Sequence, residues 1–503
     1  MAQHDSQNEQ LEEEFVEEGP GGFAQLLLNT PSWLVSTIVH VVFLLILALM
    51  TVSGAQKTQI VEIISEPPVE ELIDEEEPEE IDIEMIDPEA EVTDEVVEVT
   101  EFAEVTAVEA DEPAPAMVEV DPNAIGTLTP SNVGKSISNY SGSGLGLRAK
   151  AKQTAKMRGA NSASELAVAR GLRWIANHQY PTGGWSFDHT KAPKCQGKCK
   201  NPGSNHTDVN AATSMGILPF LGCGITHKEG KQYKNNVRAG LYFLVKRMKL
   251  EQGKGGSFHE RTGTMYSHGL AAICLTEAYG MTKDKALQMP AQQAINFIQY
   301  AQDPAGGGWR YQPRQQGDTS VVGWQLMALK SGYMAYLNVQ PQVPQKAMQF
   351  LDSVQSNSGS NYGYNAPGAG SACTAIGLLC RMYYGWKKEN PALERGVEWL
   401  SNRGPSKGDM YYNYYATQVL HHFDGEPWHK WNNTMRDQLV NTQCAADKKS
   451  CDFGSWYTKG GDHGDEKGGR LYKTALSVMT LEVYYRHSPI YRKQSMEGGL
   501  PLE

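Results

Sequence analysis

The chain has 503 residues, of which 40% are hydrophobic, so it is long enough for one large core with additional segments. Its formal charge of −13 conceals two oppositely charged parts. Residues 1–134 contain 32 acidic residues and one Lys, whereas residues 135–503 contain 44 Lys and Arg against 26 acidic residues. The favoured interpretation is an acidic, solvated spacer beside a moderately basic domain. The alternative is that the basic part meets an anionic ligand or the chain's own acidic segment. No nucleic-acid partner is expected.

The sequence predicts a transmembrane helix at residues 32–53, after an acidic N-terminal tail (1–31). From Trp33 to Val52 there are twenty residues without a formal charge, which is enough to cross the hydrocarbon core of a bilayer. A cleaved signal peptide is the alternative, because a small-residue segment follows the apolar stretch. However, the preceding residues are acidic where a signal peptide is positively charged. We therefore predict a retained, single-pass anchor.

Two polar residues one helical turn apart, Ser36 and His40, interrupt this apolar stretch. Ionisable groups at membrane depth are costly and usually have a partner. The segment resembles the N-terminal anchor of TonB-type energy-transducing proteins, although the Lys-Pro half of the TonB spacer is missing here. The resemblance implies an inner-membrane location, a periplasmic C-terminal domain and a proton-channel-type membrane partner. Against it, Lys57 favours a cytoplasmic C-terminal side, and the polar pair would equally suit a neighbouring helix.

Residues 54–160 predict an unfolded linker. Dense Glu with Pro cannot bury enough apolar surface to offset the entropy of ordering, and like-charge repulsion keeps such a segment extended. After Pro122 the composition changes to Gly, Ser and Asn, which is typical of a flexible hinge. We assign the linker the role of a tether.

Internal repeats dominate the rest of the chain. The clearest copy is RGLRWIANHQYPTGGW at residues 170–185, with a basic, a small, an aromatic and an aliphatic residue followed by Gln and Gly-x-Trp. That pattern is the QW motif of terpenoid cyclases. Further graded copies occur at residues 238–244, 297–309, 346–359, 395–400 and 454–456.

Each repeat predicts an outer helix, a glycine-rich turn and an inner helix of small and apolar residues. No single helix pair can bury both of its faces, so six pairs are expected to close into a ring. The chain therefore resembles the terpenoid-cyclase and protein-prenyltransferase superfamily. The resemblance implies an all-α (α/α)6 toroid over residues 161–490, followed by a tail (491–503). The Gln and Trp of each motif are expected to join adjacent units.

The resemblance implies two kinds of chemistry, and the residues for both are incomplete. Squalene-type cyclases protonate an alkene with an Asp-x-Asp-Asp motif, which does not occur here; Asp318 stands alone, where a helix N-cap is favoured. Protein prenyltransferases bind zinc through Asp, Cys and His. The pieces here are Asp208, His268, Cys373 and Cys380, without the close Asp-x-Cys pairing of that family. His268 is either a cavity residue or a satisfied core histidine. The catalytic candidates are Asp208, His268 and Asp318, and we predict neither a cofactor nor a metal.

Aromatic residues supply the candidates for a ligand cavity, although the same residues suit ordinary packing. They are Trp324, Tyr411, Tyr412, Tyr414, Tyr415 and Trp456. The loop at residues 460–470 contains Asp462, His463, Asp465 and Glu466, and a solvated turn is favoured there over a cation site.

The eight cysteines fall into two groups. Cys223, Cys274, Cys373 and Cys380 lie in predicted inner helices and are expected to be core residues. Four others lie in hydrophilic loops, Cys195 with Cys199 and Cys444 with Cys451. Two local disulfides are favoured, which would suit an oxidising compartment, and four thiolates on zinc are the alternative.

The sequence thus predicts a membrane-anchored toroid that binds a hydrophobic, glycan or polypeptide ligand without the standard catalysis of the superfamily. The alternative is a divergent enzyme that acts on an isoprenoid or an anionic polysaccharide. A third possibility is a mechanical role coupled through Ser36 and His40.

Overall fold

The chain divides into two units, residues 1–115 and 116–503, in a computed structural model. The structure describes residues 40–41, 145, 148, 152, 155–230, 232–487 and 490–491. His40 and Val41 are helical and exposed. The rest of the predicted span, the N-terminal tail, most of the linker and the C-terminal tail after Tyr491 lie outside the described residues. Within the described ranges, no helix is long and apolar enough to cross a membrane.

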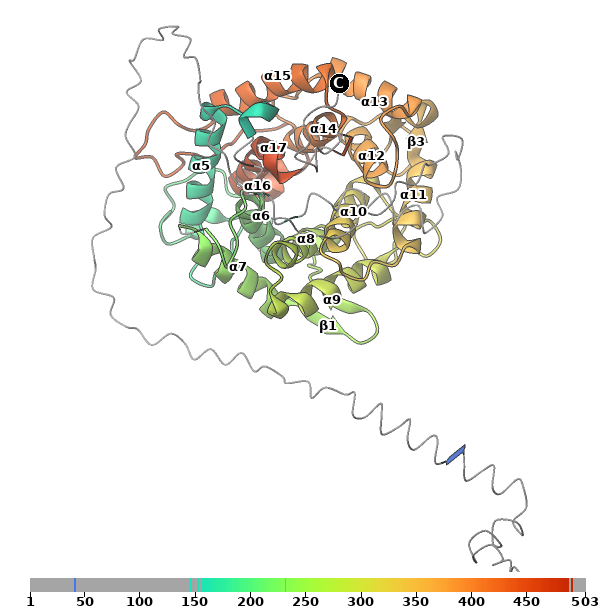
Figure 1. Ribbon diagram of the computed structural model, residues 1–503. Helices are drawn as coiled ribbons and strands as arrows, with labels where there is room; N and C mark the ends of the chain where they lie inside the picture. Colours follow the sequence, from blue (N-terminus) through green and yellow to red (C-terminus); the bar gives the residue numbers. More distant parts are fainter. Residues whose placement is uncertain are drawn as a thin grey trace, which may run out of the picture. The chain divides into compact units, whose positions relative to one another are not determined.

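Two concentric rings of helices form the second unit (Figure 1). The outer helices are α5 (Ser162–Asn177), α7 (Lys234–Arg247), α9 (Lys285–Ala301), α11 (Gln342–Val354), α13 (Pro391–Arg403) and α15 (Glu426–Thr442). The inner helices are α6 (Val209–Gly222), α8 (Thr264–Thr282), α10 (Thr319–Met334), α12 (Ser371–Tyr383), α14 (Met410–Phe423) and α16 (Asp465–Leu481). Each inner helix contacts its two inner neighbours, and α16 contacts α6, so the ring is closed. The predicted (α/α)6 toroid is confirmed.

Short elements complete the unit. A helix of one turn, α17 (Val483–Arg486), follows α16, and three 3-10 turns are η2 (Ala155–Arg158), η3 (His189–Lys191) and η4 (Asn357–Gly359). Strands β1 (Lys249–Glu251) and β2 (Gly255–Ser257) form an antiparallel hairpin between α7 and α8. Strands β3 (Gln355–Ser356) and β4 (Asn361–Tyr362) pair in the same way between α11 and α12.

The composition of each helix determines whether it lies in the inner or the outer ring. The outer helix α11 is amphipathic, and its buried residues Val343, Ala347, Leu351 and Val354 recur at helical spacing along one face. The inner helix α6 is buried on all sides, and Val209 is its single residue outside the core. Inner helices thus read as continuous runs of small and apolar residues, because they pack against inner neighbours and the outer ring at once.

The QW motifs join neighbouring repeats through hydrogen bonds. In the first motif, the Gln179 side-chain amide donates to the carbonyl of Gly183 in its own turn (2.7 Å) and to that of Asn236 in α7 (2.9 Å). The indole N–H of Trp185 donates to the carbonyl of Ile175 near the end of α5 (2.8 Å). The glutamine therefore links two units, while the tryptophan caps its own outer helix.

Gln302 and Trp309 repeat this geometry between the third and fourth pairs. A glycine is required in the turn: Gly307 has a φ of 75°, and a Cβ there would lie 2.2 Å from the carbonyl oxygen of Lys346. The backbone of α11 at Lys346 can approach this turn closely because Gly307 has no side chain.

The same joint closes the ring between the last and the first pair, a place that we call the seam. Gln443 donates to the carbonyl of Gly454 (2.9 Å) and to that of Ala167 in α5 (2.8 Å). Trp456 donates to the carbonyl of Leu439 in α15 (2.7 Å). The sequence motif identified Trp456 but missed Gln443, because an insertion separates this glutamine from its Gly-x-Trp.

The ring unit begins earlier than residue 161, where the sequence analysis placed its start. Leu145 and Arg148 are buried. The side chain of Leu145 lies directly against Gly280 of α8, where a larger residue would collide with it. The assignment of residues 54–160 to the linker was therefore wrong at its C-terminal end.

We expect Gln443→Ala to destabilise the toroid by about 2–3 kcal/mol, because it leaves two buried carbonyl groups without their donor. Urea unfolding followed by circular dichroism measures this loss. Gln179→Ala should cost a similar amount, and Gln312→Ala, at an exposed position, should cost nothing measurable. An unchanged unfolding midpoint for Gln443→Ala would show that the joint contributes little to closure.

Candidate functional site

The starts of the inner helices lie together at one end of the ring. Tyr266 of α8 donates a hydrogen bond to the Ser320 hydroxyl of α10 (2.8 Å), and Ser320 is hydrogen-bonded to Tyr411 of α14 (2.7 Å). All three side chains belong to partly exposed residues. Hydroxyl groups from three inner helices thus meet where the ring is accessible.

Two more tyrosines extend this group. The Tyr311 hydroxyl is hydrogen-bonded to that of Tyr364 (2.8 Å), and the rings of Tyr311 and Tyr266 lie 6.3 Å apart. The guanidinium of Arg310 lies over the rings of Tyr311 and Tyr364. We call the set of Tyr266, Tyr311, Ser320, Tyr364 and Tyr411 the tyrosine rim. Apart from Tyr411, the sequence analysis missed its members, because only the closed ring brings them together.

Asp318 lies beneath the tyrosine rim as the N-cap of α10. Its side chain is fully buried and accepts a hydrogen bond from the backbone N–H of Val321 (2.9 Å) and another from the Tyr364 hydroxyl (3.0 Å). Burial raises the pKa of Asp318, and these hydrogen bonds oppose the rise. The N-cap interpretation is confirmed.

Most of the aromatic candidates are packed rather than exposed. Trp324 of α10 stacks on Tyr414 of α14 (ring centroids 5.7 Å apart, 16° between planes), and Tyr415 meets both edge-on. These three rings are buried. Tyr412 and Trp456 instead pack outward against α15, so their assignment to a ligand cavity was wrong. Of the six candidates, Tyr411 is the one that is partly exposed.

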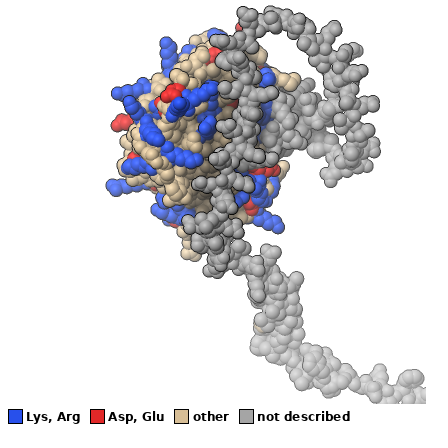
Figure 2. All heavy atoms as spheres, turned by 90° about the vertical axis from the view of Figure 1, so that its left-hand side faces the viewer, with Lys and Arg blue, Asp and Glu red and all other residues tan. Residues whose placement is uncertain are grey.

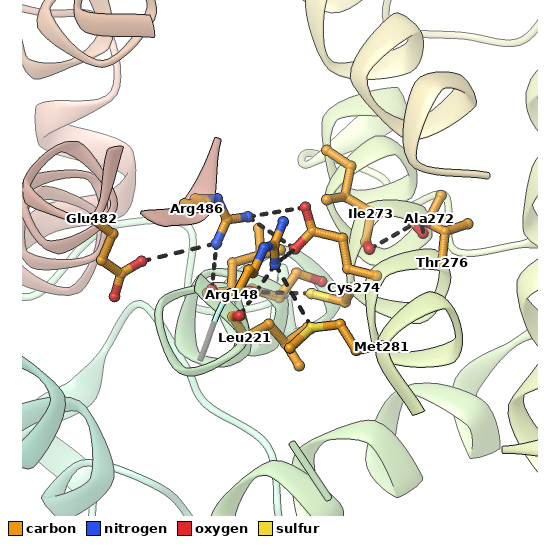
Figure 3. A network of polar contacts seen from close by, with 12 residues as sticks. Arg148, Leu221, Ala272, Ile273, Cys274, Thr276, Met281, Glu482 and Arg486 are labelled. Atoms are coloured by element: carbon orange, nitrogen blue, oxygen red, sulfur yellow. Dashed lines mark hydrogen bonds and ion pairs between the residues drawn. The ribbon is translucent and has the colours of Figure 1, made fainter. Parts of the chain in front are cut away.

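A buried charged layer lies toward the other ends of the inner helices (Figure 3). Glu277 of α8 accepts hydrogen bonds from Arg148 (2.7 Å) and Arg486 (3.1 Å). The same guanidinium groups donate to the carbonyls of Leu221 (3.1 Å) and Leu218 (2.7 Å) at the end of α6. Burial would raise the pKa of Glu277, but the two arginines outweigh it and lower that pKa to about 2.

Two further ionisable groups complete the charged layer. The ammonium of Lys330 lies 3.8 Å from the centre of the Tyr383 ring, and burial lowers the pKa of Lys330 well below its usual value. Burial raises the pKa of Glu482 to about 8, although Arg486 opposes the shift. The guanidinium of Arg486 lies 3.1 Å from the carboxylate of Glu277 but 3.9 Å from that of Glu482. Its positive charge therefore stabilises mainly the Glu277 carboxylate. We define the charged layer as Arg148, Glu277, Lys330, Glu482 and Arg486.

The catalytic candidate His268 is a satisfied core histidine. Its Nδ1 accepts from the backbone N–H of Phe258 (3.1 Å), and its Nε2 donates to the carbonyl of Ala294 in the outer helix α9 (3.1 Å). Burial lowers the pKa of His268 to about 3, so the imidazole stays neutral. The ring is therefore directed toward the outer helices, and the cavity alternative was wrong.

Asp208 precedes α6 and is 1% exposed. It accepts from the Thr262 hydroxyl (2.7 Å), and its other carboxylate oxygen is buried without a hydrogen-bond partner. The carboxylate that caps α6 is Glu260, which accepts from the backbone N–H groups of Asn210 (2.9 Å) and Ala211 (3.3 Å). Burial raises the pKa of Glu260, and nearby Asp208 contributes to the rise. The sequence analysis missed Glu260, because nothing local marks it as a cap for a helix that begins 51 positions earlier in the chain.

No prenyltransferase-type ligand set forms among the described residues. Among these residues, one group of His, Cys and acidic side chains is close enough to share a metal ion. It contains none of the residues proposed for the prenyltransferase-type set.

In the loop at residues 460–470, the ammonium of Lys473 contacts the buried carboxylates of Asp462 and Asp465. An internal cation neutralises these acids, so the favoured solvated turn was wrong for them.

All eight cysteines are free thiols, so neither predicted disulfide is formed. Cys195, Cys199 and Cys451 gather around His178, whereas the sulfur of Cys444 lies 3.4 Å from Arg470. Cys223, Cys274 and Cys380 are buried, as predicted, and Cys373 is partly exposed.

Comparison with known families supports the architecture. Residues 147–371 match the family model described as the squalene-hopene cyclase C-terminal domain. This match covers less than half of the chain. The match and the closed ring of six helix pairs support the toroid superfamily predicted from the repeats, whereas neither tests the TonB-like anchor. No curated protein matches the chain.

Solved structures similar to this terpenoid-cyclase-type ring have diverse descriptions. A GH76A alpha-1,6-mannanase from Salegentibacter sp. HEL1_6 is 10% identical, with a TM-score of 0.45 over 64% of this chain and 99% of that one. The type II terpene cyclase MstE from Scytonema is 11% identical, with a TM-score of 0.43 over 65% and 98% of the two chains. An alpha-amylase from Clostridium perfringens is 12% identical, with a TM-score of 0.41 over 63% and 97%.

Glu482 provides a test of the charged layer. Its folded-state pKa of about 8 lies above the value near 4.5 of an exposed carboxyl, so the folded ring binds its proton more tightly than the unfolded chain. The resulting stabilisation is present below pH 4.5 and is lost as the pH rises to 8. We expect Glu482→Gln to unfold like the unaltered chain at pH 4.5 but to be about 4 kcal/mol more stable at pH 8.

Urea unfolding at several pH values measures the difference. Glu466→Gln, at an exposed position near the start of α16, is the matched control and should follow the unaltered chain throughout. Equal stabilities of Glu482→Gln and the unaltered chain at pH 8 would contradict a protonated Glu482.

Proposed function

We propose that the toroid is a tethered binding module that holds an anionic, hydroxyl-rich ligand of the uronate-oligosaccharide type at the tyrosine rim, without the catalysis of terpenoid cyclases. The observation that carries the proposal is the rim itself. Five hydroxyl groups, one of them on the exposed Tyr311, adjoin a partly exposed Arg310 where the inner helices begin.

The chemistry of the rim favours a carbohydrate over an isoprenoid. An isoprenoid chain offers no hydrogen-bonding group, so it would displace water from the phenol and serine hydroxyls without replacing the hydrogen bonds that water makes. A sugar offers both hydroxyl groups and an apolar ring face, and tyrosine side chains suit both. The cyclase acid motif is absent from the sequence, and Asp318 is engaged as a helix cap.

Charge favours an anionic ligand. The chain from residue 135 onward has 44 Lys and Arg against 26 acidic residues. On the face shown in Figure 2, Lys and Arg side chains outnumber acidic ones. At the rim, the inner-helix N-termini add positive dipole ends, and Arg310 can form charge-assisted hydrogen bonds with a carboxylate.

A divergent enzyme is the second candidate, and Asp208 with Glu260 favours it. Both carboxylates are buried at the start of α6, and one oxygen of Asp208 has no hydrogen-bond partner. Acid–base catalysis often uses paired carboxyl groups, and burial raises the pKa of Glu260. This pair would act on an anionic polysaccharide.

Titration calorimetry of the full-length chain with an oligogalacturonate tests the proposed function. We expect binding that Arg310→Gln weakens about tenfold or more, because one charge-assisted hydrogen bond is lost. Arg314→Gln, at an exposed position on the same loop, is the matched control and should leave the affinity unchanged. Geranylgeranyl diphosphate is the competing probe.

Two outcomes contradict the binding proposal. Binding of the diphosphate but not of the oligogalacturonate would favour an isoprenoid ligand. Release of shortened oligogalacturonates that is abolished by both Asp208→Asn and Glu260→Gln would identify an enzyme instead.

We further propose that residues 32–53 anchor the toroid to the inner membrane with the ring outside, and that Ser36 and His40 contact a proton-channel-type complex. The support comes from the uncharged twenty-residue stretch and its polar pair. The length of the acidic linker would determine how far the ring can extend from the membrane.

Deletion of residues 1–54 should release the chain from membranes washed with alkaline carbonate. His40→Ala should remain in the membrane but lose a copurifying membrane complex, whereas Thr37→Ala, the matched polar control, should keep it. Protease added to spheroplasts should digest the ring. An intact ring under those conditions would place it in the cytoplasm and contradict the proposed orientation.

A further inference from the structure

The three thiols gathered around His178 come from distant parts of the chain. His178 directly follows α5, Cys195 and Cys199 lie in the insertion after the first QW turn, and Cys451 lies in the insertion of the last one. Their four possible ligand atoms lie within 4.8 Å of one another. We call this group the cysteine–histidine cluster.

The spacing of these atoms suits a tetrahedral metal ion. Zinc bonds of about 2.3 Å to sulfur and 2.0–2.1 Å to nitrogen place neighbouring ligand atoms about 3.6–3.8 Å apart. In the structure, the Nε2 atom of His178 lies 3.3 Å from the sulfur of Cys199 and 3.6 Å from that of Cys451. The four atoms thus need to move only slightly to surround an ion.

The surroundings fix the histidine in the form that binds a metal. Nδ1 of His178 donates a hydrogen bond to the carbonyl of Trp174 (2.7 Å), which leaves the lone pair of Nε2 directed at the thiols. The indole of Trp174 stacks on the imidazole, with ring centroids 4.0 Å apart. The backbone N–H of Cys199 donates to the sulfur of Cys195 (3.3 Å), a contact that stabilises a thiolate.

A disulfide explains this arrangement less well. The four residues form one group, and a disulfide would join only two of them and would leave the oriented imidazole unexplained. His178, Cys195 and Cys199 are almost fully buried, so the group is built into the core. The zinc alternative in the sequence analysis had four thiolates; in the structure His178 stands in place of Cys444.

We propose that His178, Cys195, Cys199 and Cys451 bind one structural zinc ion that fastens the seam of the ring. Four protein ligands leave no open position for a substrate, which is typical of structural rather than catalytic zinc. The ion would join the first and last repeats. These repeats also pair through backbone hydrogen bonds from Ser204 to Glu466 (2.9 Å) and from Asn205 to Lys467 (3.0 Å), at the start of α16.

Elemental analysis of the purified full-length chain tests the site. We expect about one zinc per chain, and more than about a tenfold loss of zinc affinity in Cys199→Ser and in His178→Ala. Cys444→Ser is the matched control, because it removes a thiol from the same insertion but from outside the cluster, and it should keep the metal. Cobalt in place of zinc should give the strong visible absorption of a tetrahedral thiolate site.

The unaltered chain provides a test that does not depend on the folding of a variant. Removal of zinc with a chelator should lower the melting temperature, and added Zn²⁺ but not Mg²⁺ should restore it. A metal-free chain whose intact mass shows two hydrogens lost for a disulfide within the cluster would overturn the proposal. So would equal zinc content in Cys199→Ser and the unaltered chain.

Discussion

The toroid depends on one constraint, which is that the last helix pair must be joined to the first. A pair has two apolar faces, and both are buried only when every pair has two neighbours. At the seam, Gln443 reaches Ala167 of α5 and so repeats the bond by which Gln179 reaches α7. Without closure at the seam, α5 and α16 would each expose a face that is buried in the closed ring.

The centre of the ring follows from closure. Arg486 comes after the last inner helix and Arg148 comes before the first outer helix, yet both meet Glu277 in α8. They also satisfy free carbonyls at the end of α6, represented by Leu218 and Leu221. Opposite charges hold this charged layer together away from water, whereas at the other end the tyrosine rim leaves hydroxyl groups within reach of a ligand. The proposed function uses the accessible end for this reason.

Sequence reasoning reached the fold because the information for each helix pair is local. The first QW motif predicts an outer helix, a turn and an indole at Trp185, and all three lie within sixteen residues. The site was harder, because its contacts join distant segments. Glu260 caps a preceding helix, and His178 resembles any residue at a helix end until Cys451 is placed beside it. Predictions made for single residues were the least successful. His268 is a core residue, and Trp456 belongs to the joint at the seam.

There is a physical reason why the seam carries contacts in addition to the glutamine joint that it shares with other repeats. The joints made by Gln179 and Gln302 connect residues 57 and 41 positions apart, whereas that of Gln443 spans 276 positions. Because closure entropy grows by about 0.6 kcal/mol for each doubling of loop length, the seam costs about 1.5 kcal/mol more than an internal joint. The cysteine–histidine cluster, and the backbone pairing between the first insertion and the start of α16, lie where that extra cost must be offset. A metal ion there would bind the closed ring and not the open chain, so its binding energy would favour closure directly.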